Sequence, residues 1–280
     1  MTAPVRADPY REAARAGQAL RPRRLSRRTV ERALSVLSPL LLLVIWEAGA
    51  IVGVVDTRFF SAPTRIFAAL GDLLATGEMQ GHIAISLQRI GIGFALGAVP
   101  GIVLGLAVGL LPIVRAIVQP LVDATFPIPK IALLPMVMLL FGIGEGSKYA
   151  IIAIAVLFLV LINTEAGVRN IERIYFDVGR NYGAGRLMFF TDIALPGALP
   201  MIMAGLKLGM GVALIVIVSA EFVGARSGIG YLIFNSWNTF QVDRMYAGLM
   251  VIAIIGFASA VGLAALERAF VPWKAGQRIG

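Results

Sequence analysis

The segment Asp177–Pro196 reads DVGRNYGAGRLMFFTDIALP and forms a charged, polar stretch between two long apolar runs. It carries an acidic residue at Asp177, a glycine six positions later at Gly183, and the sequence Ile-x-Leu-Pro at its end. The flanking runs, Tyr149–Thr164 and Ile193–Ala220, hold at most one charge each, which is typical of helices that cross a bilayer. The pattern therefore predicts a polar connector between two membrane spans. Gly183 is expected to bend the backbone between two short helices, and Pro196 and Pro200 are expected to break the helix before the next span.

The composition extends this expectation to the whole chain. The mean hydropathy is +0.84, and only 15% of the residues are charged, whereas about a quarter of a soluble domain is charged. A span needs roughly 20 apolar residues, and six runs approach that length. We expect an all-α, polytopic membrane protein with six transmembrane helices. The expected spans are Leu34–Val55, Ile90–Val114, Ala116–Gly144, Tyr149–Thr164, Ile193–Ala220 and Met245–Leu266.

The distribution of basic residues predicts the orientation. With the N-terminus inside, 17 Lys and Arg residues lie in segments on the cytoplasmic side and six lie on the other side. Cytoplasmic flanks of spans collect Lys and Arg, so both termini are expected in the cytoplasm. The expected domains are a basic cytoplasmic arm over 1–33, a transmembrane domain over 34–272 with a cytoplasmic loop over 165–200, and a cytoplasmic tail over 273–280.

Several classes of function are disfavoured by missing residue types. The chain has no cysteine and a single histidine, His82, so neither a thiolate nor a histidine metal cluster is expected, and no catalytic residues are assigned. No Gly-Lys dipeptide occurs, so the chain has no phosphate-binding loop of its own. Nucleic-acid binding is one interpretation of the basic arm, but the adjacent span favours retention at the membrane instead. Any step driven by ATP would therefore require another subunit, and an ion gradient is the alternative source of energy.

Charged residues at membrane depth are candidates for a translocation pathway, because they are costly there. Lys130 lies among the prolines Pro127 and Pro129, which are expected to unwind the third span and expose backbone groups. Asp123, Glu47 and Glu221 are the other candidates. For each of the four, a buried partner in the bundle or a side chain that reaches the interface is the structural alternative.

The second span carries a glycine at every fourth position. Such a stripe forms a groove along one helix face, where another backbone can approach closely. We expect the stripe to serve helix packing, and lining a pathway is the less favoured alternative. Its members are Gly93, Gly97, Gly101, Gly105 and Gly109.

Two segments are expected to lie at the outer surface. Ser61 precedes an amphipathic pattern over residues 63–74 and is expected to cap that helix. Gly224–Arg244 contains Tyr231 and Trp237, and such aromatic residues favour a membrane interface.

Several motifs resemble those of one branch of membrane permeases, and the match covers roughly residues 34 to 272. The segment Asp177–Pro196 resembles the loop pattern Glu-Ala-Ala, three residues, Gly, nine residues, Ile-x-Leu-Pro. That pattern belongs to permeases of ABC importers, and the branch is the one for nitrate, sulfonate and taurine. The other similar motifs are Trp46-Glu47, Ser86–Arg89, Pro127–Pro135, Phe141–Lys148, Asn163–Val168 and Ala220-Glu221.

The resemblance implies a type I permease-like bundle that works as a homodimer in the bacterial inner membrane. It implies two cytoplasmic ATPase subunits, which would bind ATP and magnesium, and a periplasmic solute-binding protein. This chain would bind no cofactor and would not be an enzyme; its remaining partner would be membrane lipid. The residues that would couple to the ATPase are Asp177, Gly183, Ala184, Gly185, Arg186, Phe189, Phe190, Ile193, Leu195 and Pro196.

One departure and two alternatives accompany this interpretation. Asp177-Val178-Gly179 keeps the acid of the loop pattern but replaces its two alanines. A secondary transporter driven by an ion gradient is the competing class, with Asp123, Glu47 or Glu221 as the site of the coupling ion. A membrane-embedded enzyme is disfavoured by the lone histidine and the lack of cysteine. The substrate stays open among nitrate, sulfonates, taurine, other small organic anions and vitamin precursors.

Overall fold

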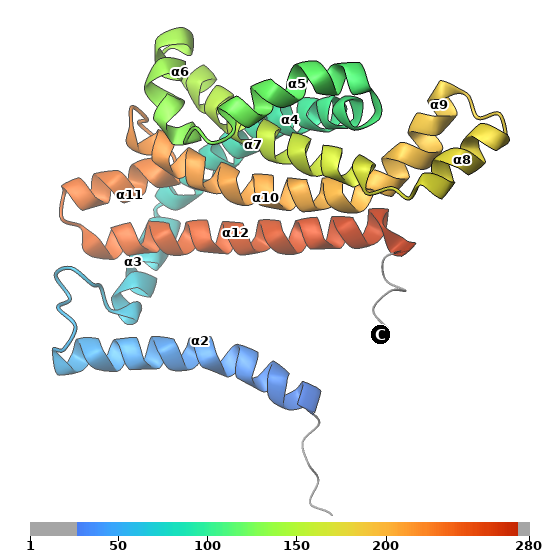
Figure 1. Ribbon diagram of the computed structural model, residues 1–280. Helices are drawn as coiled ribbons and strands as arrows, with labels where there is room; N and C mark the ends of the chain where they lie inside the picture. The colour runs from blue at the N-terminus through green and yellow to red at the C-terminus, as the bar shows by residue number, and fades with distance from the viewer. Residues whose placement is uncertain (1–26, 274–280) are drawn as a thin grey trace, which may run out of the picture. The chain divides into compact units, whose positions relative to one another are not determined.

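The computed structural model describes residues 27–273, and the chain divides into two units at the Thr57–Arg58 junction (Figure 1). Residues 1–26 of the expected arm and residues 274–280 of the expected tail lie outside the described residues. Each unit is described by itself.

The first unit consists of one described helix, α2, over Arg27–Val52. It begins inside the segment expected to be the arm, and its apolar part covers Leu37–Val52. The consecutive leucines Leu40–Leu43 are all exposed within the chain. A helix that leaves apolar side chains exposed on this scale suits contact with lipid or another protein.

The second unit is helical throughout its regular elements. Its long helices α4, α7, α10 and α12 run along the bundle, and shorter helices join them (Figure 1). The element bounds are α3 Pro63–Ala75, α4 Glu78–Leu110, α5 Pro112–Thr125, η1 Lys130–Leu133, α6 Leu134–Phe141, α7 Glu145–Arg169, α8 Arg173–Asn181, α9 Arg186–Met188, η2 Phe189–Ala194, α10 Leu195–Phe222, α11 Ile229–Asn238 and α12 Val242–Phe270.

Helix α7 forms the centre of this unit, packed between α4 and α10. Over its most apolar stretch α7 is 56% buried, whereas the corresponding stretch of α12 is 6% buried. The core joins Ile90 of α4, Ile152 and Val156 of α7, and Ile217 of α10. The α4, α7 and α10 helices thus link one end of the bundle, where α11 lies, to the other, where α8 lies (Figure 1).

The expected spans correspond to helices, with one broken exception. Four helices of the described chain are long and apolar enough to cross a membrane: α4, α7, α10 with its preceding turn η2, and α12. The third span is interrupted, as its prolines predicted: α5 and the η1–α6 segment meet at a 90° bend. Pro127 and Pro129 lie at this break, where they disfavour continued helix. The all-α fold is confirmed, and the full count of six spans stays a prediction.

The expected role of Ser61 as a helix cap is wrong. Helix α3 begins without a side-chain cap, and Ala62 occupies the N-cap position. The Ser61 hydroxyl donates instead to the carboxylate of Asp243, in the first turn of α12. Ser61 is fully buried, so a partner on α12 satisfies its hydroxyl and joins the two helices.

Candidate functional site

The connector between α7 and α10 is an ordered hairpin, with α8 on one side and η2 on the other. Helix α8 ends in a Schellman motif at Gly183: the N–H of Ala184 donates to the Gly179 carbonyl at 2.9 Å, and the N–H of Gly183 donates to the Arg180 carbonyl at 3.0 Å. Gly183 has a φ of +71°, a conformation that L side chains rarely adopt. The glycine predicted to bend the chain here therefore closes a defined turn.

Beyond this turn the chain runs as a continuous helix into the bundle. The short helix α9 leads to the π-helical turn η2, and Phe189–Phe222 forms one helical stretch of 34 residues. The expectation that Pro196 and Pro200 break the helix before the span is wrong. Pro196 lies in the first turn of α10, where a missing N–H is tolerated, and Pro200 is accommodated inside the packed helix. A displacement of the hairpin would thus reach α10 without an intervening loop.

The inner side of the hairpin is held by aromatic and aliphatic packing. The rings of Phe176 and Phe189 stack with their centroids 6.2 Å apart. Gly179 is buried against the other arm, and a Cβ at this position would lie 2.6 Å from the Ile193 Cδ1 atom. The glycine that replaces an alanine of the family pattern therefore lets α8 lie close to Ile193. The Phe189 ring also packs against Gly179 on this inner side.

The outer side of the hairpin exposes large apolar side chains, which we call the tip. Tyr182 is 88% exposed and Leu187 is 76% exposed. An exposed apolar patch of this kind marks a contact surface for another protein or a membrane. The tip comprises Tyr175, Val178, Tyr182, Leu187, Met188 and Phe190.

The remaining expected coupling residues surround the tip. Asp177, Gly183 and Gly185 are exposed, and Ala184 is half-buried. Arg186 opens α9, whereas Leu195 and Pro196 are half-buried at the start of α10. The ten residues therefore lie along the hairpin and the first turn of α10, into which it continues.

The three pathway candidates of the second unit, Lys130, Asp123 and Glu221, do not gather at one place. Lys130 donates to the backbone carbonyls of Thr125 at 2.7 Å and Phe126 at 3.1 Å, and its Nζ atom lies 4.2 Å from the centroid of the Phe158 ring. The Lys130 ammonium therefore provides hydrogen bonds to two backbone carbonyls at the end of α5. Asp123 is exposed and accepts a hydrogen bond from Gln119.

The other two candidates have different surroundings. Glu47 is half-buried on α2, in the first unit. Glu221, near the end of α10, is 1% exposed and belongs to a buried polar cluster.

This group, which we call the Arg89 cluster, consists of Ser86, Arg89, Glu145 and Glu221. Arg89 donates to one carboxylate oxygen of Glu221 at 2.8 Å and forms a bidentate pair with Glu145, with both bonds at 2.6 Å. Ser86 and the N–H of Gly230 also donate to Glu221, at 2.8 and 2.7 Å. The cluster joins α4, α7, α10 and the start of α11.

Sequence reasoning missed this cluster and placed Arg89 just outside the second span, Ile90–Val114. The apolar run begins at Ile90, whereas α4 begins at Glu78, so Arg89 lies three turns inside the helix and is 2% exposed. The motif Ser86–Arg89 was noted as a family feature, but residues more than 50 positions away supply its partners. Glu221 is therefore paired with a buried partner in the bundle, which was the structural alternative to a role in the pathway.

The glycine stripe of α4 faces α7 along its whole length. A Cβ at Gly105 would lie 2.6 Å from the Cβ of Thr164, and one at Gly109 would lie 2.6 Å from the Cβ of Val168. Gly93, Gly97 and Gly101 meet side-chain or carbonyl atoms of α7 in the same manner. The stripe allows the two backbones to approach more closely than any side chain would permit.

These features define a class of protein: a polytopic helical membrane protein with an ordered, exposed connector. Comparison with known proteins gives the family. Residues 101–273 match the model of the family described as "Binding-protein-dependent transport system inner membrane component". The chain belongs to this family and is a permease subunit of a binding-protein-dependent ABC importer.

Named relatives support the assignment, and a solved structure shares the fold. The chain is 34% identical to the taurine transport system permease protein TauC of Escherichia coli (strain K12), over 86% of this chain and 89% of TauC. It is 35% identical to the putative aliphatic sulfonates transport permease protein SsuC of the same organism, over 84% and 90%. A chain of the crystal structure of an amino acid ABC transporter with histidines shares the fold, with a TM-score of 0.54 at 15% identity and coverage of 72% of this chain and 97% of that one.

Proposed function

We propose that the hairpin formed by α8, α9 and η2 docks on a cytoplasmic ATPase and transmits its movement to the membrane helices. The observation that carries this proposal is the tip, an exposed apolar surface on a charged connector. The Schellman turn and the Phe176–Phe189 stack make the hairpin a defined unit that a partner could move as a whole.

The mechanism we propose is alternating access driven by that movement. ATP-driven closure of two ATPase subunits would displace the hairpins of two permease copies. Because η2 continues into α10, the displacement would reach the contacts that α10 makes with α7. The spans around the pathway would then open to one side of the membrane and close to the other.

The partners follow from the family and from the exposed surfaces. ATP and magnesium would bind on the ATPase, and this chain would bind no cofactor and carry out no hydrolysis. A second copy of the chain would complete the pathway, and a periplasmic binding protein would deliver the solute to the α11 end. This arrangement assigns both termini and the hairpin to the cytoplasmic side of the inner membrane, in agreement with the bias in basic residues.

The proposed substrate is a small anionic solute of the sulfonate or taurine type. Its support is that relatives over most of the chain are named as taurine and aliphatic sulfonate permeases. Another relative, 30% identical over 84% of the chain, is the formylaminopyrimidine transport permease protein ThiX of Halalkalibacterium halodurans. The test is uptake of radiolabelled taurine and alkyl sulfonates into proteoliposomes that contain the complete importer, and no uptake of either solute would contradict the assignment.

Docking is tested by site-directed crosslinking, because the chain contains no cysteine. A Cβ at Gly185 would meet no atom within 4 Å, so Gly185→Cys places an accessible thiol beside the tip. Asn238→Cys, exposed at the end of α11, serves as the matched control. We expect a short thiol crosslinker in native membranes to capture an ATPase subunit with Gly185→Cys alone. A thiol at position 185 that is labelled but captures no ATPase would contradict the proposal.

The competing class is distinguished by the energy source. Uptake that stops when ATP is depleted, while the proton gradient is held constant, is expected of the importer. Uptake that survives ATP depletion but stops when the gradient is collapsed would indicate a secondary transporter.

A further inference from the structure

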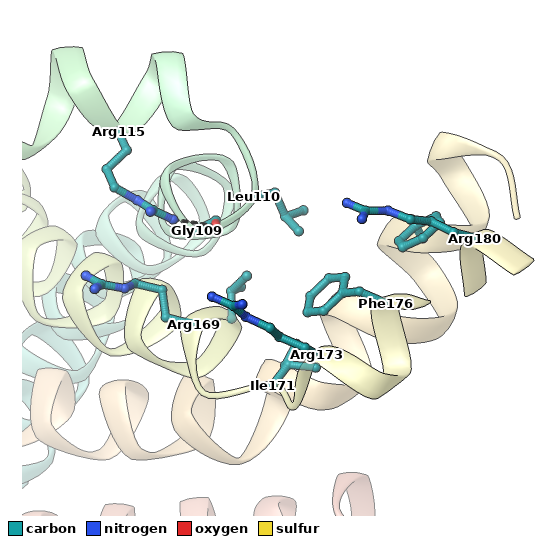
Figure 2. Close-up of a pocket in the computed structure, with 10 residues that line it drawn as sticks. Gly109, Leu110, Arg115, Arg169, Ile171, Arg173, Phe176 and Arg180 are labelled. Atoms are coloured by element: carbon teal, nitrogen blue, oxygen red, sulfur yellow. Dashed lines mark hydrogen bonds between the residues drawn. The ribbon is translucent and has the colours of Figure 1, made fainter. Parts of the chain in front are cut away.

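A cavity of about 360 Å³ lies beside the hairpin and is lined by arginines from three helices (Figure 2). Arg115 comes from α5, Arg169 from the end of α7, and Arg173 and Arg180 from α8. Figure 2 shows the Arg180 side chain extending from α8 toward Leu110 and the Arg173 side chain extending toward the end of α7, on the side of Arg169. Four arginines therefore contribute to the lining of one open cavity.

The positive charge of this cavity is only partly compensated. Glu165 forms ion pairs with Arg169 at 3.3 Å and with Arg115 at 4.0 Å. Among the described residues, Arg173 and Arg180 have no ion pair or hydrogen bond from their side chains. One carboxylate thus pairs with two of the four arginines, and the positive charge of the other two attracts an anion.

The cavity lies at the level where the membrane helices end. Helix α4 ends at Leu110 and α7 ends at Arg169. Arg115 is fixed there, since its guanidinium donates to the carbonyls of Val108 at 3.1 Å and Gly109 at 2.7 Å. The ends of spans coincide with the headgroup region of a bilayer, and basic pockets between membrane helices on the cytoplasmic side bind anionic headgroups.

The lining is polar on one part and apolar on the other. Leu110, Val168, Ile171 and Phe176 contribute apolar surface beside the arginines. A ligand with a phosphate and an adjoining hydrocarbon part would satisfy both kinds of surface. Guanidinium groups match the geometry of phosphate oxygens, to which they donate paired hydrogen bonds.

We propose that this cavity is a binding site for a phosphate-type oxyanion, in the form of an anionic phospholipid headgroup held by Arg173, Arg180 and Arg115. A lipid bound there would join α8 to the ends of α4 and α7 and would steady the hairpin that carries the tip. A soluble phosphate or sulfonate has the same chemistry, so the experiment separates these two sources. The site does not depend on the docking role of the tip.

The test is native mass spectrometry of the purified full-length chain titrated with phosphatidylglycerol or phosphatidylcholine. The variant is Arg173→Gln with Arg180→Gln, which removes two cations whose side chains are exposed and are not needed for packing. The matched control, Arg65→Gln with Arg226→Gln, removes the same charge from exposed positions elsewhere. We expect the variant to bind phosphatidylglycerol about thirtyfold more weakly and the control to bind as the unaltered chain does.

Inorganic phosphate provides the second arm. If phosphate does not displace phosphatidylglycerol, the site takes a lipid headgroup. If millimolar phosphate displaces the lipid from the unaltered chain and raises its melting temperature, with no such increase in the variant, the site takes a soluble oxyanion. Binding of both probes by the variant as by the unaltered chain, or an equal loss in the control, would overturn the proposal.

Discussion

The charged residues at the two ends of the bundle differ in burial and in the hydrogen bonds that the chain supplies to them. At the α11 end, Arg89 and Glu221 are almost fully buried, and their hydrogen bonds are supplied within the chain. At the α8 end, Arg173 and Arg180 reach an open cavity, and the apolar tip beside them is exposed. The charged residues of the α11 end thus have their hydrogen-bond partners within the chain, whereas the α8 end presents an arginine-lined cavity and an apolar tip that suit partners. The difference locates structural support at the first end and candidate interactions at the second.

The largest expected effect is a loss of thermal stability at the α11 end. Glu221→Leu removes one carboxylate partner of the buried Arg89, which keeps Glu145 and the Ser227 carbonyl, and it takes away the acceptor of the Gly230 N–H. Breaking a buried ion pair costs about 3 kcal/mol or more, because the remaining charge stays desolvated. We expect a large drop in the melting temperature of the detergent-solubilised protein, measured by the fluorescence of its tryptophans.

Glu172→Leu is the control for this change, because Glu172 is exposed. If both variants melted at the same temperature, the Arg89 cluster would not stabilise the bundle.

A second expected effect concerns the packing that connects the two ends. Gly105→Val places a branched side chain against Thr164 and should cost about 2 kcal/mol by forcing α4 away from α7. Gly91→Val is the matched control on the same helix, since a Cβ there meets no atom within 4 Å. Equal thermal stabilities of the two variants would show that close approach of α4 and α7 is dispensable.

A third effect should appear at the α8 end, as weaker coupling to the ATPase with thermal stability unchanged. Leu187→Asp introduces a charge into the tip, and we expect at least about tenfold weaker stimulation of the ATPase, because a central interface residue is altered. Phe240→Asp makes the same kind of change at an 85% exposed residue near α11. Both variants should melt as the unaltered protein does, and normal ATPase coupling in Leu187→Asp would remove the tip from the docking surface.

A smaller expected loss of stability than that of Gly105→Val concerns Lys130. Lys130→Met removes two hydrogen bonds to carbonyls at the end of α5, which should cost about 1 kcal/mol. If Lys130 also contributes to the pathway, uptake by the reconstituted importer falls while ATPase capture through Gly185→Cys persists. Unchanged uptake kinetics would limit Lys130 to its structural role.

Local patterns in the sequence were sufficient for much of this architecture. The apolar runs predicted the long helices, because a span must bury its own backbone hydrogen bonds. The spacing of Gly93 to Gly109 predicted a packing face, and Gly183 predicted the turn of the hairpin. Each of these features is encoded within a few turns of chain.

Features that depend on distant residues were not predicted. The partners of Arg89 come from α7 and α10, so nothing near Arg89 in the sequence identifies them. Ser61 was expected to cap α3 but finds Asp243 across the fold. The cavity likewise combines α5 with α8, and periodicity within either helix gives no sign of it.

The most direct test of the central claim, that the tip is the docking surface, is hydrogen–deuterium exchange on the permease with and without its ATPase. The account predicts slower exchange in residues 173–194 when the ATPase is bound, with exchange in α11 unchanged. Unchanged exchange over 173–194 in a complex shown to be intact would contradict it.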